Sequence, residues 1–431
     1  MRHLIGFCLL LIGLAGCDMS AINSPYQEQL EQESVLYSSF SLRPKHLDPA
    51  RSYSSNEVKF TGQIYEPPLQ YHYLKRPYSL IPLTATKLPT VKFLDEQGKT
   101  IDEQKPTREV AYSVYEITIQ PGIWYQPHPA FVKGERGEFE YHKLKAEDIV
   151  DIVTVSDFEY TGTRELVAED YVYQIKRLAH PEIHSPILSL MSEYIVGLKD
   201  FAKQLQQHKQ AGLEVELKSS DIAGVKAIDK YRYQITVHGK YPQLRYWLAM
   251  PFFAPIPWEA DVFYQQQGLK DKNISLDWYP VGTGPYYLAE NNPNRRMVLE
   301  KNPNFHGEKY PSEGEDSDLT SGLLDDAGNA MPFIDKVVYS LEKESIPLWN
   351  KFLQGYFDVS GISEDSFDQA IQVSTGGEFA LSEEMKAKDI ELETAIATSL
   401  YYMGFNMLDS VVGGYSEQAK KLRQAISIAI D

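Results

Sequence analysis

The segment from residue 280 to residue 307, PVGTGPYYLAENNPNRRMVLEKNPNFHG, restricts the possible folds of this chain more than any other. Gly282 and Gly284 flank Thr283, and glycine permits both positive φ angles and the close approach of another backbone. Pro285 fixes its own φ and restricts the residue before it. The segment therefore begins with a stiff corner.

A β-hairpin is predicted directly after this corner. Tyr286 opens an apolar run over residues 286–288, and a second apolar run over 297–299 ends before Asn302 and a proline. The Asn-Asn-Pro-Asn sequence between the two runs is typical of a turn. A phosphate-binding loop is excluded here, because no G-x-x-x-x-G-K-[ST] motif occurs and a strand pattern follows the glycines.

The N-terminus has the features of a secretory signal. A short basic start precedes an apolar run over residues 4–15. This run is shorter than the roughly 20 residues that a membrane-spanning helix needs, but it suits a signal peptide. The sequence LAGC at 14–17 is a lipobox-like site, so we predict a signal peptide over 1–16 and lipid attachment to Cys17. A plain secretory signal without a lipid is the alternative.

The cysteines agree with this interpretation. Cys8 lies inside the signal and Cys17 is the lipid site, so the mature fold has no thiol for a disulfide, a metal site or nucleophilic catalysis. Asp18 resembles the residue that retains lipoproteins in the inner membrane of Gram-negative bacteria. The polar sequence that follows predicts a tether, so residues 17–34 form the lipidated cysteine and its linker.

Composition narrows the class of function. A formal net charge of −18 argues against nucleic-acid binding, because such an acidic chain lacks a basic face to neutralise phosphates. The 29 tyrosines suit pockets that hold polar ligands, although strands account for most of them. We expect the lipid to be the only attachment to a membrane.

Periodicity predicts alternating strands and helices in the first part of the mature chain. Strands are expected at 35–42, 110–120 and 231–237. Apolar residues in 185–208 recur at helical spacing, which predicts a core stripe of Ile187, Leu190, Met191, Tyr194, Leu198, Phe201 and Leu205. A helix capped by Ser345 and a strand at 357–359 are predicted further on.

Four segments together resemble the extracytoplasmic solute-binding proteins of ABC importers, family 5, the peptide, nickel and opine class. The first is the glycine corner with its hairpin. The family's opening motif is matched by Leu47, Asp48, Pro49, Tyr65, Glu66 and Leu69. Residues 166–181 resemble a family helix, and residues 400–407 with 422–431 resemble a Phe-Asn strand followed by a helix.

The chain departs from the family pattern in two polar insertions, at about 134–163 and 313–329. The second carries Asp316, Asp318, Asp325 and Asp326, whose spacing does not match a calcium-binding loop. We predict a solvated loop there.

The resemblance implies an α/β fold of the two-lobed periplasmic-binding-protein type II (large, cluster C) class with mixed sheets. Lobe I is expected at 35–332, and the N-terminal part of lobe II at 333–431, with a hinge near 332–335. The family's helix and most of lobe II continue beyond the position of Asp431. We therefore expect an incomplete second lobe and a truncated reading frame.

The resemblance also implies capture of a peptide, or of a related small solute, and delivery to an ABC permease in the inner membrane. The ligand-binding candidates are Tyr65, Glu66, Trp124, Tyr401, Phe405 and Asn406. The signature residues Gly282, Thr283, Gly284, Pro285 and Tyr286 are expected to determine the fold. No catalytic residue, metal or cofactor is implied, and a periplasmic, lipid-anchored monomer is expected.

Two other classes of function are the alternatives to import. A secreted hydrolase is disfavoured, because no G-x-S-x-G, H-E-x-x-H or C-x-x-C motif occurs. A ligand-binding lipoprotein with a sensing or chaperone role, not coupled to import, stays open. Neighbouring genes for permeases and ATPases would distinguish import from that alternative.

Overall fold

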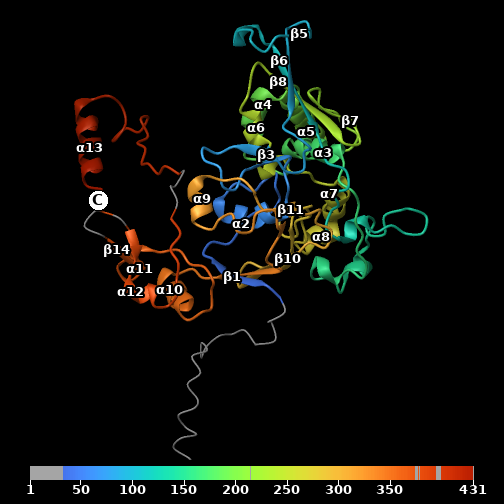
Figure 1. The fold of residues 1–431 in the computed structure, drawn as a ribbon. Coiled ribbons are helices and arrows are strands. Elements are labelled where there is room, and N and C mark those ends of the chain that lie inside the picture. Colours follow the sequence, from blue (N-terminus) through green and yellow to red (C-terminus); the bar gives the residue numbers. More distant parts are fainter. Residues whose placement is uncertain (1–32, 214, 374–376, 378, 395–398, 431) are drawn as a thin grey trace, which may run out of the picture. The chain divides into compact units, whose positions relative to one another are not determined.

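The computed structural model describes residues 33–213, 215–373, 377, 379–394 and 399–430 (Figure 1). Two compact units divide the chain, Met1–Ser363 and Glu364–Asp431. The predicted signal peptide and Cys17 lie outside the described residues. Within the described part, no helix combines the length and the apolar character needed to span a bilayer.

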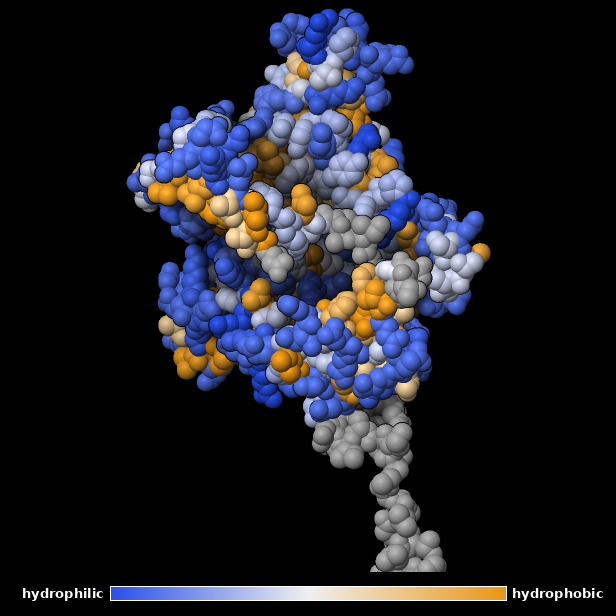
Figure 2. Space-filling view, turned by 90° about the vertical axis from the view of Figure 1, so that its left-hand side faces the viewer, coloured by the Kyte–Doolittle hydropathy of each residue, from blue (hydrophilic) through white to orange (hydrophobic). Residues whose placement is uncertain are grey.

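The first unit contains a five-stranded antiparallel sheet in the order β5-β4-β6-β8-β7 (Figure 1). Its strands are β4 (Thr90–Leu94), β5 (Thr100–Ile101), β6 (Tyr112–Thr118), β7 (Val225–Asp229) and β8 (Arg232–His238). The strands predicted at 110–120 and 231–237 are confirmed. Figure 2 shows mainly hydrophilic residues over the β5 end of this sheet, at the top of the view.

Three helices follow the β6 region in sequence and pack near this sheet: α3 (Ala168–Leu178), α4 (Leu188–Tyr194) and α5 (Leu198–Gln210). Tyr171 of α3 stacks on Tyr233 of β8, with ring centroids 5.1 Å apart. The predicted stripe over 185–208 is divided between two helices, because the chain turns at Gly197 with φ of 80°. Most of the stripe is buried as predicted, but Leu190 is 40% exposed, which corrects its assignment to the core.

A four-stranded mixed sheet holds the hairpin. Its order is β1-β13-β10-β9, with β1 parallel to β13 and the other pairs antiparallel. Its strands are β1 (Val35–Phe40), β9 (Tyr286–Asn292), β10 (Arg296–Lys301) and β13 (Lys336–Leu341). Helix α2 (Ser55–Ile64) contacts this sheet through Phe60, whose ring lies 5.9 Å from Phe40 and 5.0 Å from Tyr339. The predicted mixed α/β architecture and the hairpin are confirmed.

The remaining elements of the first unit are short. They are β2 (Leu69–Tyr71), β3 (Leu80–Pro82), α6 (Leu244–Trp247), α7 (Trp258–Gln265), α8 (Gln267–Asp271), β11 (Glu308–Lys309), α9 (Asp316–Thr320), β12 (Ala330–Met331) and α10 (Ser345–Leu353). Strand β13 lies beyond the predicted lobe boundary at 332/333, and it is hydrogen-bonded to β1 and β10. The boundary between the lobes stays a prediction.

Two local predictions in this region are wrong. The N-cap of α10 is Glu344, because the helix already includes Ser345. The segment 357–359 is not a strand. Asp358 of this segment is hydrogen-bonded to β1: its N–H donates to the carbonyl of Tyr37 at 2.9 Å and its carboxylate accepts the Tyr37 N–H at 2.7 Å.

The insertions differ in their packing. Residues 134–163 contain 3₁₀ turns at Ala146–Ile149 and Val155–Asp157, and they bury Ile149 and Phe158 in the core. The insertion at 313–329 contains the short helix α9 and is mostly exposed. In the described part of the chain, no three His, Cys, Asp or Glu side chains are grouped to bind a metal.

The second unit contains α11 (Glu364–Ala370), β14 (Ile371–Val373), β15 (Phe379–Leu381), α12 (Glu383–Lys386) and α13 (Glu417–Ile428). The helix predicted at 422–431 is confirmed in part, since α13 begins earlier and ends at Ile428. The strand resemblance at 400–407 is not borne out by the backbone: these residues are irregular, because no neighbouring strand among the described residues pairs with them.

One buried carboxylate organises the loop before α2. Glu57 is 2% exposed. One of its oxygens accepts the backbone N–H groups of Lys45 and His46, each at 3.0 Å, and the other accepts those of Tyr53 and Ser54 at 3.0 and 3.2 Å. Burial alone would raise the pKa of Glu57, but these four hydrogen bonds lower it below the usual value.

Substitution Glu57→Gln is expected to lower the free energy of unfolding by about 2 kcal/mol, because an amide –NH₂ would face two of the four N–H donors. The contribution of Glu57 is present above its unfolded pKa and is lost as the pH falls through the lower folded value. Urea denaturation at neutral pH measures the loss. The exposed substitution Glu96→Gln is the matched control, and an equally small effect of both would contradict the prediction.

Candidate functional site

The signature corner lies against the C-terminal end of α2. The N–H of Gly284 donates to the carbonyl of Ile64 at 2.9 Å. A Cβ atom at Gly282 would lie 1.9 Å from that same carbonyl oxygen, and one at Gly284 would lie 2.6 Å from the carbonyl oxygen of Gln63. Neither glycine has φ in the left-handed region. Close backbone approach, rather than positive φ, therefore requires glycine here.

Two side chains that the sequence interpretation missed hold the corner. Gln126 accepts the Gly282 N–H at 3.1 Å and donates to the carbonyl of Pro280 at 3.2 Å. Asn302 donates its side-chain amide to the carbonyl of Gly284 at 2.9 Å. Both are buried. The Asn302-Pro303 pair predicts the end of a strand, but by itself it does not predict this hydrogen bond to the corner.

The corner fixes the two candidates that follow α2. Tyr65 and Glu66 are 2% and 3% exposed. Glu66 Oε1 lies 2.9 Å from Nε2 of His306, which comes from the end of the signature segment. The other oxygen of Glu66 is buried and has no hydrogen-bond partner among the described residues. Glu66 is thus a buried carboxylate whose charge is matched by an imidazole.

Burial alone would lower the pKa of His306, but the hydrogen bond and charge of Glu66 outweigh it and raise the pKa above 6.5. Titration by NMR is expected to show this raised value, and Glu66→Gln is expected to lower it. The exposed substitution Glu159→Gln should leave the titration unchanged. A His306 pKa that Glu66→Gln does not lower would contradict the assignment. By linkage, protonated His306 contributes stability below its unfolded pKa, and that contribution is lost as the pH rises through the folded value.

A small hollow lies beside this pair. Glu308 lines it and accepts hydrogen bonds from the side-chain amide of Gln70 and from the hydroxyl of Tyr73, the latter at 3.2 Å. Its volume is about 200 Å³, and Pro285 and Tyr286 of the signature lie in its wall. The signature corner therefore contributes to a cavity as well as to the fold.

The other ligand-binding candidates lie apart along the chain. Trp124 is 43% exposed and forms a β-bridge with Glu165. Tyr401 is 92% exposed, Asn406 is exposed and Phe405 is half-buried, all in the second unit. Tyr65 and Glu66 lie against the signature segment. The other three candidates, Tyr401, Phe405 and Asn406, lie in the second unit, which is described by itself. Their roles stay predictions.

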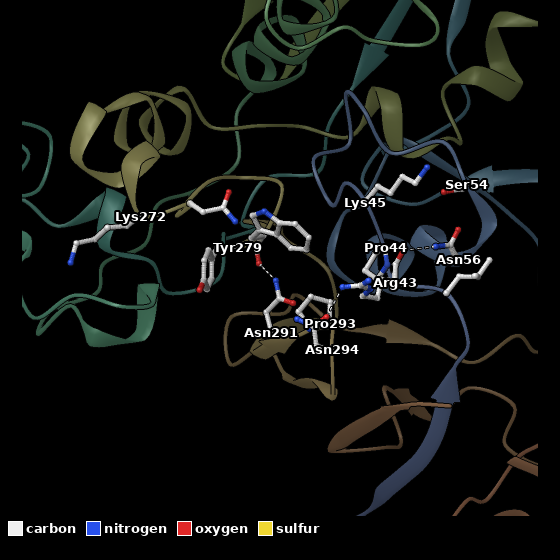
Figure 3. A pocket seen from close by; sticks show the side chains of 13 residues that line it. Arg43, Pro44, Lys45, Ser54, Asn56, Lys272, Tyr279, Asn291, Pro293 and Asn294 are labelled. Carbon is white, nitrogen blue, oxygen red and sulfur yellow. Dashed lines mark hydrogen bonds between the residues drawn. The ribbon is translucent and has the colours of Figure 1, made fainter. Parts of the chain in front are cut away.

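A larger hollow of about 1060 Å³ lies between the loop before α2 and the hairpin turn (Figure 3). Arg43, Lys45 and Lys272 are its charged lining residues. Figure 3 shows the two lysines at opposite ends of the hollow. Lys272 donates to the carbonyls of Val150 and Ile152 at 3.1 and 2.8 Å. The cations are therefore spread along the hollow and do not converge on one bound group.

His128 is a second histidine-centred arrangement, and it is structural. Its Nδ1 accepts the N–H of Ala130 at 3.1 Å, and its Nε2 lies 2.8 Å from the hydroxyl of Tyr264. Burial lowers the pKa of His128 to about 3, so the ring is neutral. A neutral, fully hydrogen-bonded imidazole packs the core and is not a general base aimed at a ligand.

Comparison with known sequences gives a consistent result. A family model for the bacterial extracellular solute-binding proteins, family 5 Middle, matches residues 159–431. The periplasmic oligopeptide-binding protein OppA of Salmonella typhimurium is 28% identical over 277 residues, which cover 60% of this chain and 46% of that protein. OppA of Escherichia coli is 26% identical over 201 residues, covering 44% of this chain and 33% of the relative.

Solved structures give matches of lower similarity. Listeria monocytogenes OppA bound to peptide has a TM-score of 0.48 at 15% identity, over 77% of this chain and 47% of that chain. DppA from Helicobacter pylori in complex with the peptide STSA has a TM-score of 0.46 at 17% identity, over 77% and 47%. The chain thus spans about half the length of these relatives.

Proposed function

The chain is a member of the bacterial extracellular solute-binding proteins of family 5, and from this membership we propose that the whole protein captures peptides for an ABC importer. The observation that carries the proposal is the family match over residues 159–431. The sequence relatives are named periplasmic oligopeptide-binding proteins, which favours peptides over other small solutes. The proposed role is binding without catalysis.

The proposed mechanism uses two lobes on a hinge. Lobe I corresponds to 35–332, lobe II begins at 333, and residues 332–335 form the hinge. A ligand that contacts both lobes binds the closed form more tightly than the open form, and this difference in affinity drives closure. The closed form would then dock on an inner-membrane permease.

Six residues are proposed to lie at the cleft or the hinge: Tyr65, Glu66, Trp124, Tyr401, Phe405 and Asn406. The exposed ones can contact a ligand directly: Trp124 is 43% exposed, Tyr401 is 92% exposed and Asn406 is exposed. Tyrosine offers a flat apolar face together with a hydroxyl, and asparagine offers both a donor and an acceptor to a peptide backbone. Tyr65 and Glu66 are buried, so we assign them to support of the cleft wall.

The proposed location is the periplasm. The signal-like segment 1–16 and the lipobox cysteine Cys17 support export and anchoring of a monomer to the inner membrane by a lipid. Lipid labelling of wild type and Cys17→Ala tests the anchor. Label on both proteins, or on neither, would exclude Cys17 as the lipid site.

Peptide capture is tested on the full-length protein by thermal shift with a library of di- to hexapeptides. A rise in melting temperature is expected, because a ligand that binds only the folded state stabilises it. Substitutions Tyr401→Ala and Asn406→Ala should reduce the shift. Tyr415→Ala, at another tyrosine that is 92% exposed, is the matched control. No shift with peptides beside a clear shift with another solute would exclude peptide as the ligand.

A further inference from the structure

Glu308 is a half-buried carboxylate that forms no ion pair within the described part of the chain. Its oxygens accept hydrogen bonds from the neutral side chains of Gln70 and Tyr73. The ion pairs around it join Glu66 to His306 and Lys75 to Glu313, and Glu308 itself forms no ion pair with a described residue. Each carboxylate oxygen can accept more than one hydrogen bond, so Glu308 keeps free acceptor capacity.

Burial raises the pKa of Glu308, and the nearby charge of Glu66 acts in the same direction, whereas the hydrogen bonds from Gln70 and Tyr73 and the charge of His306 lower it. The pKa stays above its usual value, so these partners compensate the ionised form only in part. A further positive charge placed beside Glu308 would stabilise its ionised form. His306 supplies part of this charge, but its imidazole is hydrogen-bonded to Glu66, and none of the residues that line the adjacent hollow is Lys, Arg or His.

The walls of that hollow suit a cation. Four aromatic residues line it: Tyr73, Tyr286, Phe305 and Phe333. The hydroxyl of Tyr286 is already used, since it donates to the carbonyl of Ile334 at 2.7 Å. Phe333 is 44% exposed, which leaves one wall of the hollow open to solvent. Aromatic rings attract ammonium and guanidinium groups through the negative potential of their faces.

We propose that this hollow binds the ammonium or guanidinium group of an organic cation, with Glu308 as the countercharge and the four aromatic residues as walls. The hollow measures about 200 Å³. Ligand cavities for whole drug-sized molecules are roughly 300–1,000 Å³, so this one accepts a single charged group and its first carbons. Every residue that forms the hollow lies in the first unit, and three of them, Pro332, Phe333 and Ile334, belong to the proposed hinge. The proposal rests on Glu308 and the aromatic walls, and it uses none of the six residues proposed above for peptide capture.

Two probes of equal shape test the charge requirement. Propylguanidinium and its neutral analogue propylurea are titrated into the full chain, and binding is followed by NMR or calorimetry. The expected result is saturable binding of propylguanidinium and at least about tenfold weaker binding of propylurea. Binding of propylguanidinium should weaken as sodium chloride is added, because salt screens the charge of Glu308. Equal binding of the two probes, or no saturable binding of propylguanidinium, would overturn the proposal.

Variants locate the site. Glu308→Gln keeps the shape of the side chain and should reduce propylguanidinium binding by about tenfold or more. Glu313→Gln, on an exposed neighbouring carboxylate, should leave it unchanged. Phe333→Leu changes an exposed wall without disturbing the core, and it should weaken binding several-fold even if Glu308→Gln proves unstable. Affinities of both Glu308→Gln and Phe333→Leu equal to that of wild type would place the cation elsewhere.

Discussion

Replacement of Arg177 by methionine is expected to lower the free energy of unfolding by about 3–5 kcal/mol, because it would leave two buried carboxylates without their cation. Arg177 is 2% exposed. Its guanidinium donates to both oxygens of Asp48, at 2.9 and 2.6 Å, and to Asp261 at 3.1 Å. Chemical denaturation at neutral pH measures the loss.

The pH dependence of the destabilisation distinguishes unpaired buried charge from simple loss of packing. Burial alone would raise the pKa of Asp48, but Arg177 outweighs it and holds the pKa below its usual value. In the wild type, Asp48 therefore contributes stability above its unfolded pKa, and this contribution is lost as the pH falls through the lower folded value. In Arg177→Met, the loss of unfolding free energy relative to the wild type should become smaller as the pH falls, because protonation removes the unpaired charge of Asp48.

The exposed pair of Arg296 and Glu290 provides the control. These side chains are 44% and 37% exposed, and such surface pairs contribute about 0–1 kcal/mol. Arg296→Met should therefore have little effect at any pH. Two results would contradict the charge argument. Arg177→Met could lose no more unfolding free energy than the control Arg296→Met, or its loss could stay the same at every pH.

The hairpin of β9 and β10 shows what the sequence predicts well. Glycine, proline and asparagine act on their own backbone, and the apolar runs beside them lie within a few residues of one another. The corner, both strands and the turn were therefore predictable from one short segment. The same holds for β6, β8 and α13, whose periodicity is local.

The candidate site could be predicted only in part, because its contacts join distant segments. The family motif indicated Glu66, but its partner His306 lies 240 residues further along the chain. The buried pair of Asp48 and Arg177 is separated by 129 residues. Neither residue type carries a local signal of burial, since arginine is mostly exposed and histidine is intermediate between buried and exposed types. The role of His306 follows from the three-dimensional approach of the signature to α2.

The strand prediction for 400–407 is wrong for a related reason. Its alternating apolar residues are compatible with a strand, but a strand forms only where another strand supplies hydrogen bonds. Leu400 and Tyr401 are 87% and 92% exposed, so this segment buries little apolar surface within the described chain. Strand propensity alone does not keep this segment in a β-strand.

Substitution Gly282→Ala is expected to lower the free energy of unfolding by at least about 3 kcal/mol, the upper end of the range for overpacking. The added Cβ would lie 1.9 Å from the carbonyl oxygen of Ile64, and backbone atoms cannot rotate away as a side chain can. Separation of the two segments would also break the Gly284 N–H bond to that carbonyl and displace Glu66 from His306. The His306 titration should therefore shift toward lower pH in any folded fraction.

Gly361→Ala is the matched control for this prediction. No atom lies within 4 Å of a Cβ at Gly361, and its φ is outside the left-handed region. Alanine there should be neutral or should stabilise by about 0.4–1 kcal/mol, through the lower entropy of the unfolded chain. Both variants remove the same glycine flexibility, so the difference between their unfolding free energies isolates the contact with Ile64. Equal unfolding free energies would show that the corner can move away from α2, and that the signature glycines do not fix the position of Glu66.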